Sequence, residues 1–141
     1  MIILREYIPD DWTKIDDAVE PFMFLEPFER FDEIVQKGLA VTAIEDDIVM
    51  ACGGVSYVDD QEGVVWMKIS KKCFCQPYRW GRTIRETFSL MAKSLGAMRI
   101  VTYILKGFCK GERLARLIGM TKTDKEYEFN DNIYRRYTVV I

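Results

Sequence analysis

The hydrophobic period changes twice between residues 39 and 105, and this limits the folds open to the chain. Residues 39–44, 48–58 and 64–70 are rich in β-branched side chains and are joined by short acidic turns, which predicts an antiparallel meander. Residues 79–95 then carry apolar side chains at helical spacing, and residues 98–105 return to a strand pattern. Because strand–helix–strand crossovers are right-handed and join parallel strands, this segment predicts a parallel pair within a mixed sheet.

Further elements flank this centre. The same patterns predict a strand at residues 2–8 and two helices at residues 12–19 and 26–37 before the meander. After the crossover they predict a helix at residues 110–118 and a hairpin of two strands at residues 120–129 and 133–141. Gly53 and Gly54 predict a bulge in the second meander strand. The order β-α-α-β-β-β-α-β-α-β-β predicts an α/β fold, in which a mixed sheet carries helices on both faces. The absence of repeats and linkers predicts one domain over residues 1–141.

Charge divides the chain into two halves. Residues 1–62 hold 16 acidic and 4 basic side chains, whereas residues 63–141 hold 6 acidic and 16 basic ones, so the net charge of -2 hides the division. Most of the cations fall between Lys68 and Arg116, where Glu86 and Glu112 are the only acids. Segregated charge produces a local field that attracts an anion, although a solvated basic helix face gives the same count.

Histidine is absent, which excludes Ser-His and Cys-His nucleophiles and leaves carboxylates, tyrosine, cysteine, lysine or water for proton transfer. Cys73 and Cys75 form a C-x-C pair, but the chain lacks the second pair of a tetrahedral site, so we expect no metal. Hydrophobic residues make up 49% of the chain, yet no stretch approaches the roughly 20 that a membrane span needs. We therefore expect a cytoplasmic protein without a membrane segment.

The element order, with a helix launched from a basic turn after the third meander strand, resembles the GNAT acyltransferase fold over nearly the whole chain. In that family acyl-CoA lies between this strand and its parallel neighbour, and its pyrophosphate binds a glycine-containing turn at the helix N-terminus. The corresponding turn here is Tyr78-Arg79-Trp80-Gly81-Arg82-Thr83, in which Gly81 matches the central glycine of the family motif. Tyr78 replaces the arginine or glutamine of that motif, and Thr83 replaces its last small residue.

The resemblance implies acetyl-CoA as cosubstrate. It assigns the contacts with acetyl-CoA to the third meander strand, the connector and the turn, namely to Met67, Lys68, Ile69, Lys71, Lys72, Arg79, Trp80, Gly81, Arg82 and Thr83. The charge pattern supports this assignment independently, because several cations flank the turn and match the phosphates of such a ligand. These cations are Lys71, Lys72, Arg79, Arg82 and Arg85.

Three side chains are the catalytic candidates that the resemblance suggests. Glu62 starts the third meander strand, near the position of a base in some members, although a turn residue of this kind is also a solvated charge. Tyr103 on the second crossover strand and Tyr134 on the last hairpin complete the assignment, although a strand tyrosine commonly only packs. Tyr127 and Tyr137 share that hairpin and are alternatives to Tyr134.

An amine acceptor fits the acidic first half, because the first two helices line the acceptor channel in this family. The acidic side chains concerned are Asp10, Asp11, Asp16, Asp17, Glu26, Glu29, Asp32 and Glu33, and a solvated helix face is the alternative interpretation. The chain would then transfer an acetyl group from acetyl-CoA to an amine.

Two other functions stay open. Ala115 stands where many members carry the tyrosine that protonates the leaving thiolate, which fits an inactive GNAT-fold protein that binds a partner or a second copy of itself. Residues 94–103 and 112–120 are similar to small GNAT-like phage proteins, including internal virion proteins. This similarity implies a location in a host cytoplasm or in a virion. The apolar loop at residues 22–25 is a candidate contact surface for a partner. Nucleic-acid binding is the third function, but the chain is acidic overall and contains no known nucleic-acid motif.

Overall fold

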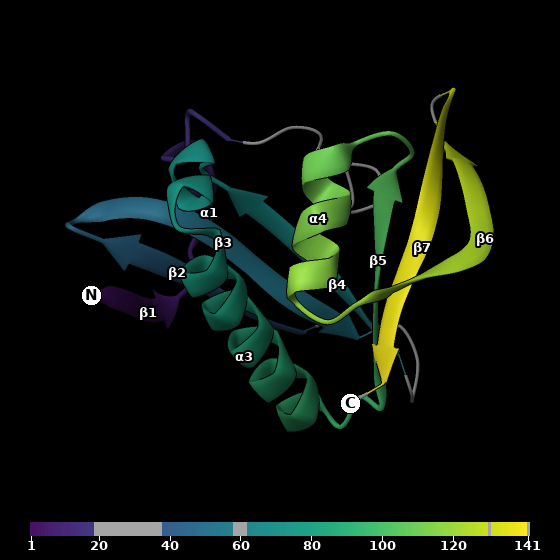
Figure 1. Ribbon diagram of the computed structural model, residues 1–141. Helices are drawn as coiled ribbons and strands as arrows, with labels where there is room; N and C mark the ends of the chain where they lie inside the picture. Colours follow the sequence, from purple (N-terminus) through teal and green to yellow (C-terminus); the bar gives the residue numbers. More distant parts are fainter. Residues whose placement is uncertain (19–37, 58–61, 130, 141) are drawn as a thin grey trace.

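The computed structural model describes residues 1–18, 38–57, 62–129 and 131–140. A seven-stranded sheet has the order β1-β2-β3-β4-β5-β7-β6, in which β4 and β5 are parallel and the other neighbours antiparallel (Figure 1). The strands are β1 (Ile2–Glu6), β2 (Gly38–Glu45), β3 (Ile48–Tyr57), β4 (Glu62–Ile69), β5 (Arg99–Leu105), β6 (Thr121–Phe129) and β7 (Asn132–Val140). The helices are α1 (Pro9–Thr13), the 3₁₀ helix η2 (Lys71–Cys75), α3 (Pro77–Leu95) and α4 (Cys109–Leu117).

The described elements confirm the predicted fold class. The meander is formed by β2, β3 and β4, and the crossover through α3 joins β4 to β5 in parallel register. The second predicted helix, at residues 26–37, and the apolar loop at residues 22–25 lie outside the described residues.

The first helix was predicted too late in the chain. α1 spans Pro9–Thr13 rather than residues 12–19. Proline fits the first turn of a helix, and the carboxylate of Asp11 accepts a hydrogen bond from the N–H of Ile8 at 3.0 Å, which fixes the start of the helix.

The predicted bulge is also wrong in position. It lies between β2 and β3 at Ala43 and Ile44, whereas Gly53 and Gly54 pair regularly with β2. The two glycines are needed for close backbone approach instead, since a Cβ on Gly54 would lie 2.4 Å from the carbonyl oxygen of Leu39.

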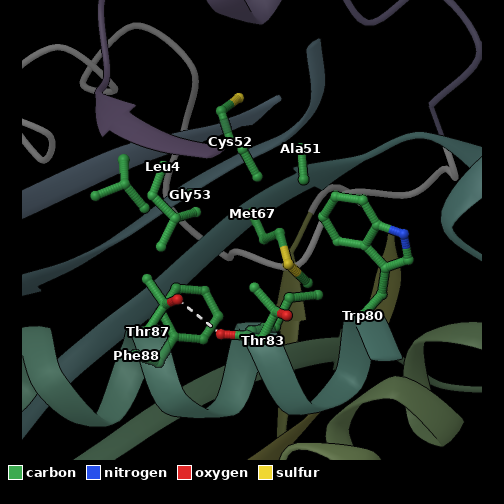
Figure 2. A pocket seen from close by; sticks show the side chains of 12 residues that line it. Leu4, Ala51, Cys52, Gly53, Met67, Trp80, Thr83, Thr87 and Phe88 are labelled. Atoms are coloured by element: carbon green, nitrogen blue, oxygen red, sulfur yellow. Dashed lines mark hydrogen bonds between the residues drawn. The ribbon is translucent and has the colours of Figure 1, made fainter. Parts of the chain in front are cut away.

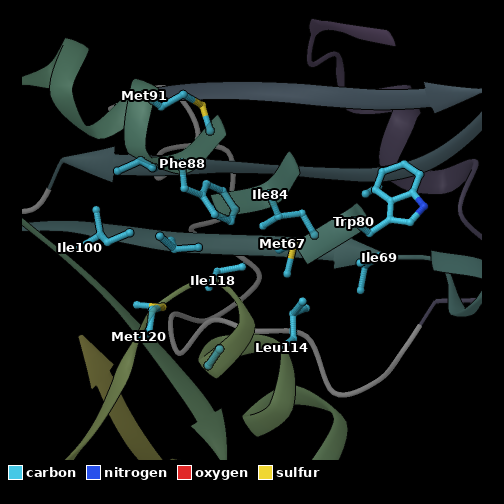
Figure 3. Close-up of a cluster of buried hydrophobic side chains, with 14 of the residues drawn as sticks. Met67, Ile69, Trp80, Ile84, Phe88, Met91, Ile100, Leu114, Ile118 and Met120 are labelled. Carbon is cyan, nitrogen blue, oxygen red and sulfur yellow. The ribbon is translucent and has the colours of Figure 1, made fainter. Parts of the chain in front are cut away.

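Helices cover both faces of the sheet. α3 and α4 lie side by side on one face (Figure 1), and their apolar side chains point onto the strands (Figure 3). On the opposite face Trp66 and Cys52 pack with Ile15, which follows α1. No described helix combines the length and the apolar character that crossing a membrane requires.

Candidate functional site

β4 and β5 separate beyond their first three residues. Backbone pairing is confined to residues 62–64 of β4 and residues 99–101 of β5. The next bond comes from a side chain, because the buried hydroxyl of Thr102 donates to the carbonyl of Val65 at 3.2 Å. Along residues 66–69 no described strand pairs with the β5-side edge of β4, so backbone groups there are available to an extended ligand.

The connection from β4 to α3 uses most of its own backbone donors. The hydroxyl of Ser70 accepts from the N–H of Lys72 at 3.1 Å, and its carbonyl accepts from the N–H of Cys73 at 3.1 Å. The N–H of Lys71 donates to the carbonyl of Asp17 at 3.0 Å. These amides therefore hold the connection in shape and are not directed at a ligand.

The first turn of α3 retains few amide donors for an anion. Pro77 has no N–H, and the N–H of Trp80 donates to the carbonyl of Gln76 at 3.1 Å. The first-turn amides of Tyr78 and Arg79 have no acceptor within an α-helix. An anion at this end of α3 would thus depend more on side-chain cations than on the backbone.

Gly81 lies within α3 and not in a turn before it, which corrects the sequence prediction. Because α3 begins at Pro77, residues 78–83 are helical throughout. A Cβ on Gly81 would lie 3.2 Å from the Cβ of Leu117 on α4. The glycine therefore sets how closely α3 and α4 approach.

Gly81→Ala tests this packing role. Alanine improves helix propensity by roughly 1 kcal/mol, whereas Leu117 must move by a few tenths of an ångström. We expect denaturant titration to show a change of less than about 1 kcal/mol, and calorimetry to show a change in acyl-CoA affinity of less than about twofold. A loss of affinity of about tenfold or more without a loss of stability would restore Gly81 to a phosphate-binding role.

The predicted cations do not act as one group. The Arg79 guanidinium lies 2.5 Å from the carboxylate of Glu45, at the end of β2, and donates to the side chain of Gln76 at 2.9 Å. The side chains of Lys71, Lys72 and Arg82 are exposed and form no ion pair with a carboxylate in the described ranges. Arg79 is therefore committed to the fold, whereas these three cations have no carboxylate partner among the described residues.

An apolar pocket lies where η2, α3 and α4 meet, at the end of the free edge of β4. Its lining consists of Ile69, Cys73, Phe74, Pro77, Trp80, Leu114 and Leu117. The Cys73 thiol donates to the carbonyl of Met50 at 3.7 Å, and burial raises its pKa to about 12. Cys73 is thus a neutral part of the wall and not a nucleophile.

A second apolar pocket lies between α3 and the strands β1, β2, β3 and β4 (Figure 2). Trp80, 2% exposed, lines both pockets and so separates them. Thr83 and Thr87 border the second pocket, where the Thr87 hydroxyl donates to the carbonyl of Thr83 at 2.6 Å. Thr83 therefore borders the second pocket and not the pocket at the end of the free edge of β4.

The three β4 side chains assigned to the cosubstrate point in two directions. Met67 and Ile69 are buried in the core beneath α3 and α4. Lys68 lies on the opposite face, where its ammonium donates to the carbonyl of Trp12 at 2.7 Å and lies 4.8 Å from the centre of the Trp12 ring. Along the free edge a ligand would meet the backbone of these residues.

Glu62 forms an ion pair with Arg136 of β7. One guanidinium nitrogen donates to both carboxylate oxygens, at 2.8 and 2.6 Å, and the two side chains are mostly buried. Since both oxygens are engaged, Glu62 would have to give up part of this pair before it accepted a proton from a bound amine.

The pair predicts non-additive effects on stability. We expect Glu62→Ala and Arg136→Ala each to lower the free energy of unfolding by roughly 1–3 kcal/mol, because each leaves a mostly buried charge without its partner. Denaturant titration of the double variant should show a coupling of about 1 kcal/mol or more. Strictly additive losses would mean that the two groups do not interact in solution.

Tyrosines gather beside this pair on the sheet face opposite α3 and α4. Tyr103 is opposite Arg136 in the register, and its ring lies 5.2 Å from that of Tyr127. Tyr134 is opposite Tyr127 on the neighbouring strand, so all these side chains share one face. The structure therefore brings together the three catalytic candidates as a polar cluster. Tyr137 lies on the other face, where burial raises its pKa.

Sequence reasoning missed the role of Asp11. Its side chain is fully buried, accepts hydrogen bonds from both terminal guanidinium nitrogens of Arg5 at 2.6 and 2.7 Å, and accepts another from the Thr42 hydroxyl at 2.6 Å. The Arg5 guanidinium holds the pKa of Asp11 well below its usual range. Asp11 is thus a structural anchor between α1 and the sheet, and not part of a solvated acidic face.

No group of three or more His, Cys, Asp or Glu side chains gathers into a metal-binding arrangement within the described residues. Cys73 is buried and Cys75 is exposed, so the C-x-C pair does not converge on one point. Cys109 is also exposed, and its thiol donates to the carbonyl oxygen of Gly107 at 3.7 Å.

This arrangement of strands and helices was compared with known structures. A GNAT family acetyltransferase from Elizabethkingia anophelis, with acetyl-CoA bound, aligns with a TM-score of 0.72 and 15% identity, over 99% of this chain and 98% of the other. The chain has the GNAT acetyltransferase fold.

Two further structures agree with this GNAT fold. A Bacillus subtilis acetyltransferase in complex with CoA aligns at a TM-score of 0.72 and 16% identity, over 99% of this chain and 97% of the other. An acetyltransferase from Streptococcus agalactiae aligns at 0.72 and 19% identity, over 99% and 98% of the two chains. No family model and no curated protein matches the sequence.

Proposed function

We propose that this chain is an acyl-CoA-dependent N-acetyltransferase of the GNAT type, active in the cytoplasm, that transfers an acetyl group from acetyl-CoA to an amine. The observation that carries the proposal is the separation of β4 from β5 beside the apolar pocket where η2, α3 and α4 meet. The free edge of β4 suits the amide groups of the pantetheine arm. Solved proteins of the same fold contain acetyl-CoA or CoA.

In this proposal, catalysis depends mainly on positioning. Backbone N–H groups along residues 66–69 would orient the thioester and polarise its carbonyl. An amine held on the opposite sheet face attacks the carbonyl carbon, so that a C–N bond forms and the C–S bond breaks. The amine proton passes to water or to Glu62, and the thiolate is protonated from solvent or from Tyr103 or Tyr134. Ala115 is fully buried and offers no acid.

A second candidate function is an inactive GNAT-fold protein that binds a partner. It is favoured by Ala115 and by the backbone donors that the β4–α3 connection uses internally. The three similar structures described above are acetyltransferases and give no support to a link with phage proteins.

Calorimetric titration with acetyl-CoA tests the first function. We expect saturable binding with a Kd of roughly 1 µM to 1 mM, the usual range for enzyme substrates, and a matching rise in Tm. A thiol-release assay with a panel of amines then tests the transfer itself. Binding without release of CoA from any amine would favour the inactive protein, and the lack of binding at millimolar acetyl-CoA would contradict both the cosubstrate and the reaction.

A further inference from the structure

Cations from two helices meet at the pocket between η2, α3 and α4. The ammonium of Lys110, in the first turn of α4, lies 5.9 Å from the centre of the Phe74 ring, and Phe74 lines this pocket. Lys110 therefore reaches across from α4 to η2 at the rim of the pocket. Its contact with an aromatic ring leaves the charge available to an anion.

The face that α4 turns toward this pocket carries a second cation. Leu114 and Leu117 line the pocket, and Lys110 and Arg113 each precede one of them by four residues. Residues four apart lie one above the other on a helix, so both exposed cations lie on the pocket side of α4. Glu112, the one acid of this helix, is hydrogen-bonded to Tyr137 of β7 and is not on this side.

α3 contributes cations to the same place. Gly81 packs against Leu117 of α4, and the exposed Arg82 follows it in the same turn of α3. One turn later, the Cδ of Arg85 lies 3.8 Å from the position that a Cβ on Gly119 would occupy, so Arg85 also extends toward the end of α4.

Among the residues that the structure describes, these cations lack the ion pairs that neutralise others in the protein. Arg5, Arg79, Arg135 and Arg136 each pair with a carboxylate. Within the described ranges Arg82, Arg85, Lys110 and Arg113 have no such partner. A set of unneutralised charges around an apolar pocket suits a ligand that combines phosphates with an apolar chain.

We propose that Lys110 and Arg113 of α4, together with Arg82 of α3, bind the phosphate groups of the cosubstrate from both sides of the pocket. The inference rests on the proposed function and extends it. The sequence assigned the phosphates to the turn around Gly81 and to cations of the β4–α3 connection and of α3, Arg82 among them, but that connection uses its amides internally and Arg79 is paired with Glu45. Side-chain cations from α4 take the place of those donors.

A pair of charge-reversal variants tests this assignment. Lys110→Glu combined with Arg113→Glu is compared with Lys122→Glu combined with Lys125→Glu, which makes the same change in net charge at exposed positions of β6. Calorimetry with CoA should show a loss of affinity of about tenfold or more for the α4 variant, and of less than about threefold for the β6 control. Far-UV circular dichroism and Tm establish that both variants are folded.

A comparison of CoA with dephospho-CoA, and a series of salt concentrations, test whether the α4 cations contact the phosphates. Dephospho-CoA, which lacks the 3′-phosphate, should bind the unmodified protein more weakly than CoA, and the α4 variant should show a smaller difference between the two. The decrease in affinity with rising salt should also be shallower in the α4 variant, because fewer charged contacts remain to be screened.

The outcomes separate the two proposals. Unchanged CoA affinity in a folded α4 variant would overturn the phosphate assignment and leave the cosubstrate proposal standing. Failure of the unmodified protein to bind CoA would overturn both. If the unmodified protein ignores CoA but binds random duplex DNA, and the α4 variant loses that binding, the cations serve nucleic acid and the phosphate assignment is likewise wrong.

Discussion

Asp11→Ala should lower the free energy of unfolding by about 3 kcal/mol. The substitution removes the acceptor of hydrogen bonds from Arg5, Thr42 and the Ile8 N–H, and it leaves the fully buried Thr42 without that partner. Since these bonds join α1 to β1 and β2, the loss should also loosen the packing of α1 on the sheet. Denaturant titration at neutral pH measures the effect.

The neighbouring Asp10 provides the control. Its side chain is exposed, so Asp10→Ala should change the free energy of unfolding by less than about 1 kcal/mol, the range of a helix-dipole contribution. Equal losses for the two variants would show that burial and hydrogen bonding do not distinguish these carboxylates, contrary to the structure.

The Asp11 anchor also predicts a pH dependence. Because the pKa of Asp11 is lowered in the folded protein, its stabilisation is fully present above the unfolded pKa of about 3.9 and is lost as pH falls toward the folded pKa. The stability difference between the parent and Asp11→Asn should therefore be constant near neutral pH and decrease below about pH 4. A difference that grew on acidification would contradict the ion pair with Arg5.

Trp80→Ala should be the most damaging single change near the proposed site. Trp80 is 2% exposed and lies between the two apolar pockets, so its removal joins them and leaves a large cavity beneath the first turn of α3. Comparable substitutions cost roughly 3–5 kcal/mol. We expect a loss of this size in denaturant titration, accompanied by weaker binding of CoA because the α3 end of the pocket is no longer fixed.

Tyr78 supplies a matched control in the same turn of α3. It is aromatic too, but 81% exposed, so Tyr78→Ala should change stability by less than about 0.5 kcal/mol. If Trp80→Ala fails to fold, Trp80→Phe tests the same idea, since it fills part of the space and should cost less. A Trp80→Phe variant as stable as the parent, but unable to bind CoA, would show that Trp80 contacts the ligand directly rather than separating the pockets.

Local patterns in the sequence predicted the order of the described elements. Strand alternation, helical spacing and turn residues are short-range signals, and they gave the meander, α3, the parallel crossover and the last hairpin. The same short range explains why residues 78–83 were predicted as a turn although they are helical. A glycine after a basic segment fits both a phosphate-binding turn and close packing of two helices, and the contact with Leu117 comes from a distant part of the chain.

The site depended on long-range contacts that no local pattern contains. Glu62 and Arg136 are 74 positions apart in the chain, and the Arg79–Glu45 pair joins a helix to a distant strand end. One local signal was nevertheless available: Pro77 is favourable in the first turn of a helix, and it places the start of α3 two residues before the predicted start at residue 79. For the phosphate site that we propose, the paired spacing of Lys110 and Arg113 ahead of Leu114 and Leu117 is another local signal.

The most direct test of the central claim is a titration of the isotope-labelled protein with CoA, followed through its backbone amide chemical shifts. If the cosubstrate lies between the free edge of β4 and the N-terminal ends of α3 and α4, the largest changes should fall on residues 66–69, 78–82 and 110–114, while β1 and β6 stay unchanged. Changes confined to Leu4, Val41 and Thr87 around the second pocket, or no changes at millimolar CoA, would contradict the account.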